Sequence, residues 1–192
     1  MLIRVCGVGS VLGGVLFVAW GYIDRPNISE NLRIATHVLA FAVPTLFLVG
    51  VVGILALCGG RVGVLGWAGM VLALYGSGLP VVADIVHVEP LLYGYFAERG
   101  WPPSLTEWLA VMDSGLILVG IAAVGTGPLR VLGALTFAIG VFGWGYDLTD
   151  SAGVALEAAP RLVHVGFGLL FSLGWVMLGP GLWAERARSR PI

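Results

Sequence analysis

The sequence predicts an all-α integral membrane protein in which six transmembrane helices form three antiparallel hairpins. Hydrophobic residues make up 58% of the chain and charged residues only 11%, with a mean hydropathy of +0.98. Soluble domains have about 25% charged residues. The apolar residues also form runs of the length, about 20 residues, that a helix needs to cross a bilayer. Composition and run length therefore point to the same fold class.

Six such runs, separated by short connections, account for nearly all of the 192 residues. We expect one membrane domain, 1–192, without a separate soluble part. Residues 1–20 begin like a signal peptide but lead into Gly-Tyr-Ile-Asp-Arg-Pro, which offers no small-residue cleavage site, so we expect the first span there. The expected spans lie at about 5–23, 34–58, 62–83, 105–125, 129–146 and 161–183.

The three expected hairpins resemble one another, which predicts an internal pseudo-repeat. Their first helices end in similar polar elements, at 20–24 (Trp-Gly-Tyr-Ile-Asp), 79–84 (Leu-Pro-Val-Val-Ala-Asp) and 144–147 (Trp-Gly-Tyr-Asp). The second helices of the first and third hairpins carry His-Val pairs that begin at His37 and His164. Repeats in membrane proteins often place a site where they meet. We therefore expect a polar site at the end of the bundle that carries these elements.

The connections differ in length between the two ends of the bundle. Those near 59–61 and 125–128 are short and rich in glycine, so neighbouring helices should pack antiparallel. The connection 84–107 is longer and contains apolar and aromatic residues, among them Leu91, Leu92, Tyr93, Tyr95 and Trp101. This predicts an interfacial outer loop in the headgroup region.

The distribution of arginines predicts the orientation in the membrane. By the positive-inside rule, the arginine-rich end should be cytoplasmic, with both termini inside. The general look of a compact chain rich in Gly and Trp favours a bacterial plasma membrane. A net charge of −1 and the lack of a basic run argue against nucleic acid as a partner. The arginines on the expected inner side are Arg4, Arg61, Arg130, Arg186, Arg188 and Arg190.

Three ionisable residues, one in each hairpin, are candidates for chemistry. His37, Asp113 and His164 lie one to two turns inside their spans, where an unpaired ionisable group costs roughly 2.5–3.5 kcal/mol. They should therefore face inward. Two histidines and a carboxylate could form a facial metal triad, and the two histidines alone could be axial ligands to haem. No specific metal or haem motif accompanies them, so neither cofactor is favoured.

Acid–base chemistry without a metal is the second hypothesis for these residues. Asp113 lies between Met112 and Ser114 on an apolar helix, and burial disfavours an ionised carboxylate, so Asp113 could donate a proton in an apolar pocket. Such a pocket suits a membrane-embedded cyclase or isomerase acting on an isoprenoid or quinone-like molecule. Carboxylates expected around its mouth are Asp24, Asp84 and Asp147, and expected lining tryptophans are Trp20, Trp67, Trp144 and Trp175.

A third hypothesis gives these residues a purely structural role. The histidines could pair with aspartates or carbonyl groups at the helix ends, and the tryptophans could anchor the chain at the interface. The function that we expect is binding, with or without acid–base conversion, of a lipophilic small molecule near the outer face. The alternatives are an accessory or assembly subunit of a membrane complex, a metal- or haem-binding redox protein such as a metal-dependent oxidoreductase, and a small-solute transporter. Expected partners are membrane lipids and the lipophilic ligand. The sequence is compatible with a homo-oligomer or with a place in a larger membrane complex.

Overall fold

The structure, a computed structural model, describes residues 1–23, 30–88, 105–152 and 158–188. It confirms the all-helical fold, because this part of the chain contains six α-helices, one short 3-10 turn and no strand. The helix bounds lie within a few residues of the expected spans. The elements are α1 (Leu2–Ile23), α2 (Glu30–Cys58), η1 (Gly59–Arg61), α3 (Gly63–Val88), α5 (Leu105–Val124), α6 (Arg130–Ala152) and α7 (Ala158–Arg188).

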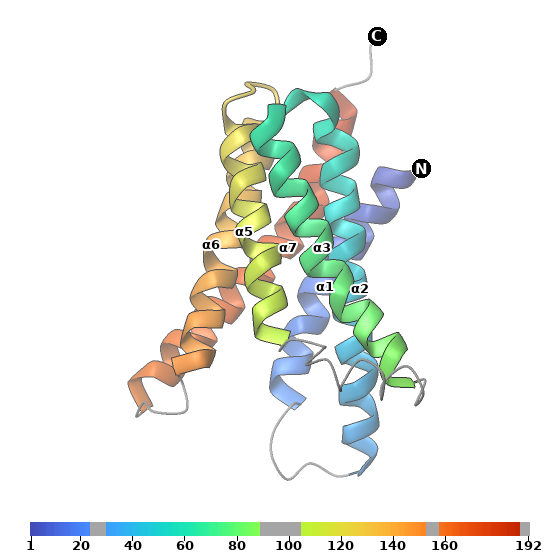
Figure 1. Cartoon of the computed structure of the whole chain (residues 1–192), viewed down its shortest axis with the longest axis vertical. Helices are drawn as coiled ribbons and strands as arrows, with labels where there is room; N and C mark the ends of the chain where they lie inside the picture. Colours follow the sequence, from blue (N-terminus) through green and yellow to red (C-terminus); the bar gives the residue numbers. More distant parts are fainter. Residues whose placement is uncertain (24–29, 89–104, 153–157, 189–192) are drawn as a thin grey trace.

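The six helices form a closed ring. Each helix packs against the next one along the chain, and α7 returns to pack against α1. A contact between α2 and α7 crosses the ring. Consecutive helices run in opposite directions, and the start of α1 and the end of α7 lie at the same end of the bundle, the upper end in Figure 1. This is the arrangement that three consecutive hairpins predict.

Helix length and composition indicate a membrane protein. In the described residues, five helices are long and apolar enough to cross a membrane, and α5 contributes a shorter apolar stretch, Trp108–Val124. Large apolar side chains are exposed on the outside of the bundle, including Val71, Val131 and Leu173. A soluble protein rarely exposes so much contiguous apolar surface. The five long spans are Leu2–Gly21, Val38–Cys58, Gly63–Val82, Arg130–Thr149 and Leu162–Ala187.

The short connections at the upper end depend on two glycines in the left-handed region. Gly63, just after η1, and Gly127, between α5 and α6, both have φ of 61°. Other residues rarely adopt this conformation. These turns bring α3 beside α2 and α6 beside α5, as the glycine-rich connections predict.

Small residues bring α3 and α5 into backbone contact. A Cβ atom added at Gly115 would overlap the backbone of Ala73 and Gly69, and one added at Gly76 would overlap the backbone of Met112. Contacts of this kind let helices approach closely where lipid supplies no hydrophobic driving force. The α3–α5 pair is therefore stabilised by close packing of the two backbones.

Aromatic side chains fill the centre of the bundle on the side of α1, α2 and α7. The indole ring of Trp175 is fully buried and stacks on Phe47, with ring centroids 4.4 Å apart. Phe171 meets both Phe47 and Phe17 in edge-to-face geometry. From Phe17 the aromatic contacts continue to Tyr146 of α6, with ring centroids 5.3 Å apart. The core thus extends as a chain of rings to the lower half of the bundle.

Candidate functional site

A cavity of about 350 Å³ lies between α1, α6 and α7. Its walls are aromatic and aliphatic side chains, with glycines on α1 and α7 that leave room. The described lining contains one imidazole and no charged carboxylate or guanidinium group. The lining residues are Phe17, Val18, Gly21, Tyr146, His164, Val165, Gly168 and Leu169.

His164, the most polar group of the lining, is held by a hydrogen bond to α6. Its Nδ1 lies 3.0 Å from Oγ1 of Thr149. The Thr149 hydroxyl also lies 2.8 Å from the carbonyl oxygens of both Gly145 and Tyr146, which share its single proton as acceptors. A hydroxyl group has one proton, so donation to a carbonyl leaves its oxygen to accept from Nδ1–H. With the Thr149 proton on a carbonyl, a neutral imidazole would hold its own proton on Nδ1 and would have Nε2 as an acceptor.

Aromatic stacking fixes the plane of the same imidazole ring. The ring of Tyr146 stacks on His164 with centroids 4.3 Å apart and an interplanar angle of 28°. Close packing of α6 against α7 makes this possible, because a Cβ at Gly145 would overlap the ring of Phe167. At Gly168, a Cβ would lie 3.1 Å from the Tyr146 ring. Glycines on both helices therefore bring the two rings together.

The cavity lies at the ends of three apolar spans. Gly21 ends one span, Thr149 ends another, and His164 lies two residues inside the span that begins at Leu162. The rim is apolar and exposed on the outside of the bundle, where Val165 is 54% and Leu169 is 52% exposed. The cavity therefore combines a polar inner group with an opening among exposed apolar side chains.

A second polar cluster lies between α5 and α6. Asp113 is 1% exposed and Asp147 is 4% exposed, and the two carboxyl groups are close enough for their charges to interact. Neither carboxyl oxygen of Asp113 has a hydrogen-bond partner in the described part of the chain. The Asp113 carboxyl packs directly on Gly143, where an added Cβ would overlap it. Asp113 and Asp147, both predicted site residues, are thus neighbours, but neither lines the cavity.

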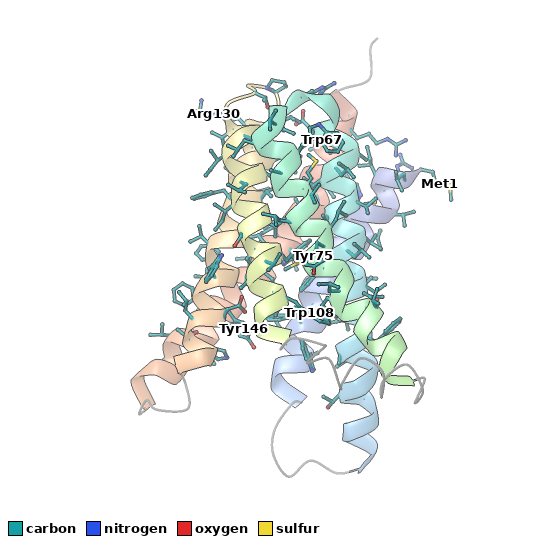
Figure 2. The ribbon with its side chains drawn as sticks, viewed as in Figure 1. Met1, Trp67, Tyr75, Trp108, Arg130 and Tyr146 are labelled. Atoms are coloured by element: carbon teal, nitrogen blue, oxygen red, sulfur yellow. The ribbon has the colours of Figure 1, made fainter. Side chains whose placement is uncertain are left out.

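The four tryptophans predicted to line one pocket are dispersed. Trp20 packs on Phe17 with ring centroids 6.2 Å apart, beside the cavity, whereas Trp175 is buried in the core. Trp144 donates its indole N–H to the Ser114 hydroxyl at 3.0 Å, which links α6 to α5. Trp67 is 47% exposed and lies toward the upper end, far from Tyr146 in Figure 2. The described lining of the cavity includes none of the four.

Three predicted site residues lie outside what the structure describes. Asp24 falls between α1 and α2, and the side chains of Asp84 and His37 are outside the described set, although their backbones belong to α3 and α2. The described residues contain no group of three or more His, Cys, Asp or Glu side chains that could hold a metal ion. Because the proposed triad and the haem site both include His37, they stay predictions.

Sequence reasoning missed several residues that build the cavity. Tyr146 belongs to the repeated Trp-Gly-Tyr-Asp element, so the repeat did carry a signal for it. Thr149 and Phe17 had no such signal, because their roles depend on how α6, α7 and α1 approach one another. The chain matched no protein-family model, no curated protein and no solved structure. The geometry of the chain is therefore the basis for its proposed function.

Proposed function

We propose that the protein binds a lipophilic small molecule in the cavity between α1, α6 and α7. The observation that carries this proposal is the combination of an apolar, laterally open cavity with one anchored imidazole, His164, in its lining. Binding sites for small molecules are typically apolar, with a few polar groups that orient the ligand. A molecule dissolved in the bilayer could reach this site from the side, past Val165 and Leu169.

The size and charge of the cavity define what it would hold. A volume of about 350 Å³ is near the lower end of the 300–1,000 Å³ typical of ligand pockets. It suits a ring or a short branched segment better than a bulky lipid headgroup. The described lining contains no Arg or Lys side chain that could pair with a phosphate or carboxylate group of a ligand. A ligand with a neutral headgroup therefore fits best.

The proposal includes a location and an orientation. With the arginines Arg4, Arg61 and Arg130 at the end where α1 begins and α7 ends, the positive-inside rule assigns that end to the cytoplasm. The cavity would then open to the outer leaflet of a bacterial plasma membrane. This orientation is supported by the charge distribution of the sequence.

Conversion of the bound molecule, as by a cyclase or isomerase, would use His164 as the group that exchanges a proton with it. The Nε2 atom is the nitrogen that Thr149 does not engage. The Asp113–Asp147 pair lies between α5 and α6, outside the described lining of the cavity, so the proton transfer is not assigned to it.

Two glycines allow a matched test of the binding site. Leucine at Gly21 should fill the cavity, whereas leucine at Gly166 should leave it open, because Gly21 lines the cavity and Gly166 does not. Both positions have open space around them, so neither substitution should disturb the packing. We expect Gly21→Leu to weaken binding of nonylphenol, a neutral lipophile, by roughly tenfold or more, while Gly166→Leu keeps wild-type affinity.

Native mass spectrometry of the purified protein would count bound nonylphenol over a concentration series. The same series with nonylphenol methyl ether tests whether a different neutral headgroup also enters the cavity. Equal binding of both compounds by wild type, Gly21→Leu and Gly166→Leu would contradict the proposal. Failure of wild type to bind either compound would also contradict it.

A further inference from the structure

We infer that the ligand of this cavity carries a hydroxyl group that donates a hydrogen bond to Nε2 of His164. This inference rests on the proposed function and narrows its substrate class to neutral lipophilic alcohols and phenols. Three features support the inference: the imidazole nitrogen that holds the proton, the aromatic walls of the cavity, and the position of His164 near the end of its span.

The position of the imidazole proton follows from the hydrogen bonds of Thr149. Its hydroxyl lies 2.8 Å from two carbonyl oxygens of its own helix, those of Gly145 and Tyr146. Hydroxyl groups of Ser and Thr in helices commonly donate to the carbonyl one turn earlier. Ser77, Ser114 and Thr136 of this chain do the same. The Thr149 oxygen therefore accepts from His164, and Nδ1 holds the proton.

The other nitrogen, Nε2, then favours ligands that can donate a hydrogen bond. In a neutral imidazole with Nδ1–H, Nε2 can only accept a hydrogen bond. An ether, ester or ketone has no proton to donate, so it would leave Nε2 without a partner. A hydroxyl group satisfies Nε2 directly. A site that hydrogen-bonds a ligand hydroxyl discriminates strongly against analogues that lack it.

The surroundings of His164 fit the rest of such a molecule. Phe17 and Tyr146 offer aromatic faces and edges to a flat ring. The imidazole lies near the end of its span, where hydroxyl headgroups of amphiphiles reside, whereas Val165 and Leu169 lead along α7 toward the middle of the span. A phenol or alcohol with an alkyl tail could therefore place its hydroxyl at His164 and its tail against the exposed rim.

Comparison of nonylphenol with its methyl ether tests the inference, because the two differ only in the hydroxyl proton and one methyl group. We expect wild type to bind the phenol about tenfold more tightly than the ether, the effect of one good hydrogen bond. His164→Phe keeps an aromatic ring against Tyr146 but lacks Nε2, so it should bind both compounds equally. Thr149→Val, which removes the acceptor for Nδ1–H, should reduce the preference for the phenol.

Nitrogen-15 NMR of the imidazole gives a second, independent readout. The His164 signals can be assigned by their loss in His164→Phe, and we expect them to show a protonated Nδ1 and an unprotonated Nε2. A protonated Nε2 in the free protein, or equal affinity of wild type for phenol and ether with loss of both in Gly21→Leu, would overturn the inference but leave the proposed function standing. Failure to bind either compound would overturn both.

Discussion

Gly115→Val is expected to separate α3 from α5 and to lower the stability of the bundle by about 1–3 kcal/mol or more. A side chain at this position has no room, because even a Cβ would overlap the backbone N of Ala73 and the carbonyl oxygen of Gly69. Backbone atoms cannot move aside as the end of a flexible side chain can. The helices must therefore shift, and the neighbouring contact at Gly76 would be lost with them. Thermal unfolding in detergent would measure the loss.

Gly78→Val is the matched control for this prediction. Gly78 lies on α3, in the same helix pair, and has no atom within 4 Å of an added Cβ. Both variants introduce the same β-branched residue into a helix, so the difference between them isolates packing from helix propensity. Equal unfolding temperatures for Gly115→Val and Gly78→Val would contradict the close approach of α3 to α5.

Gly143→Ala is expected to destabilise the protein through a single neighbour, the carboxyl group of Asp113. A methyl group at Gly143 would overlap both carboxyl oxygens and Cγ of Asp113. The Asp113 side chain is 1% exposed, so it cannot turn out into solvent and must move within the packed interior to avoid the methyl group. Overpacking of this kind costs about 1–3 kcal/mol. Chemical unfolding of the two proteins in mixed micelles would measure the difference.

The double variant separates this contact from other effects. Asp113→Ala removes the overlap, so Gly143→Ala should cost much less in that background, with a coupling energy of roughly 0.5–3 kcal/mol. Asp113→Ala alone should change stability little or raise it, because both carboxyl oxygens are buried without a hydrogen-bond partner in the described residues. A large loss of stability in Asp113→Ala would show that the carboxyl group has other partners. A coupling energy of zero would contradict the overlap between Gly143→Ala and Asp113.

The fold could be predicted from the sequence because bilayer physics leaves few choices. An apolar run of about 20 residues must satisfy its backbone internally, which makes it a helix. The glycine-rich connections at 59–61 and 125–128 then set the antiparallel pairing. Individual helix ends differ by a few residues. The long α7, for example, continues beyond the expected end at 183 to Arg188.

The candidate site was predictable only in part. The depth of Asp113 and His164 in apolar spans marked them as residues that need an inward-facing environment, and Asp113 is indeed fully buried. The sequence could not show that Asp113 neighbours Asp147 whereas His164 neighbours Thr149, because those pairings depend on the rotation of α5, α6 and α7 about their axes. Trp175 is a second example. The rotation of α7 about its axis places this side chain in the aromatic core against Phe47, and the sequence alone could not distinguish this from a place in the wall of a pocket.

The most direct test of the binding cavity is a map of photo-cross-links on the protein in lipid vesicles. A long-chain alcohol with a diazirine on its tail would be activated in the membrane, and mass spectrometry would locate its adducts on the chain. Binding in the cavity predicts adducts concentrated on residues 17–21 and 162–169, reduced in Gly21→Leu and retained in Gly166→Leu. Adducts spread evenly over the exposed faces of all the helices, with equal yields in the two variants, would contradict a specific site between α1, α6 and α7.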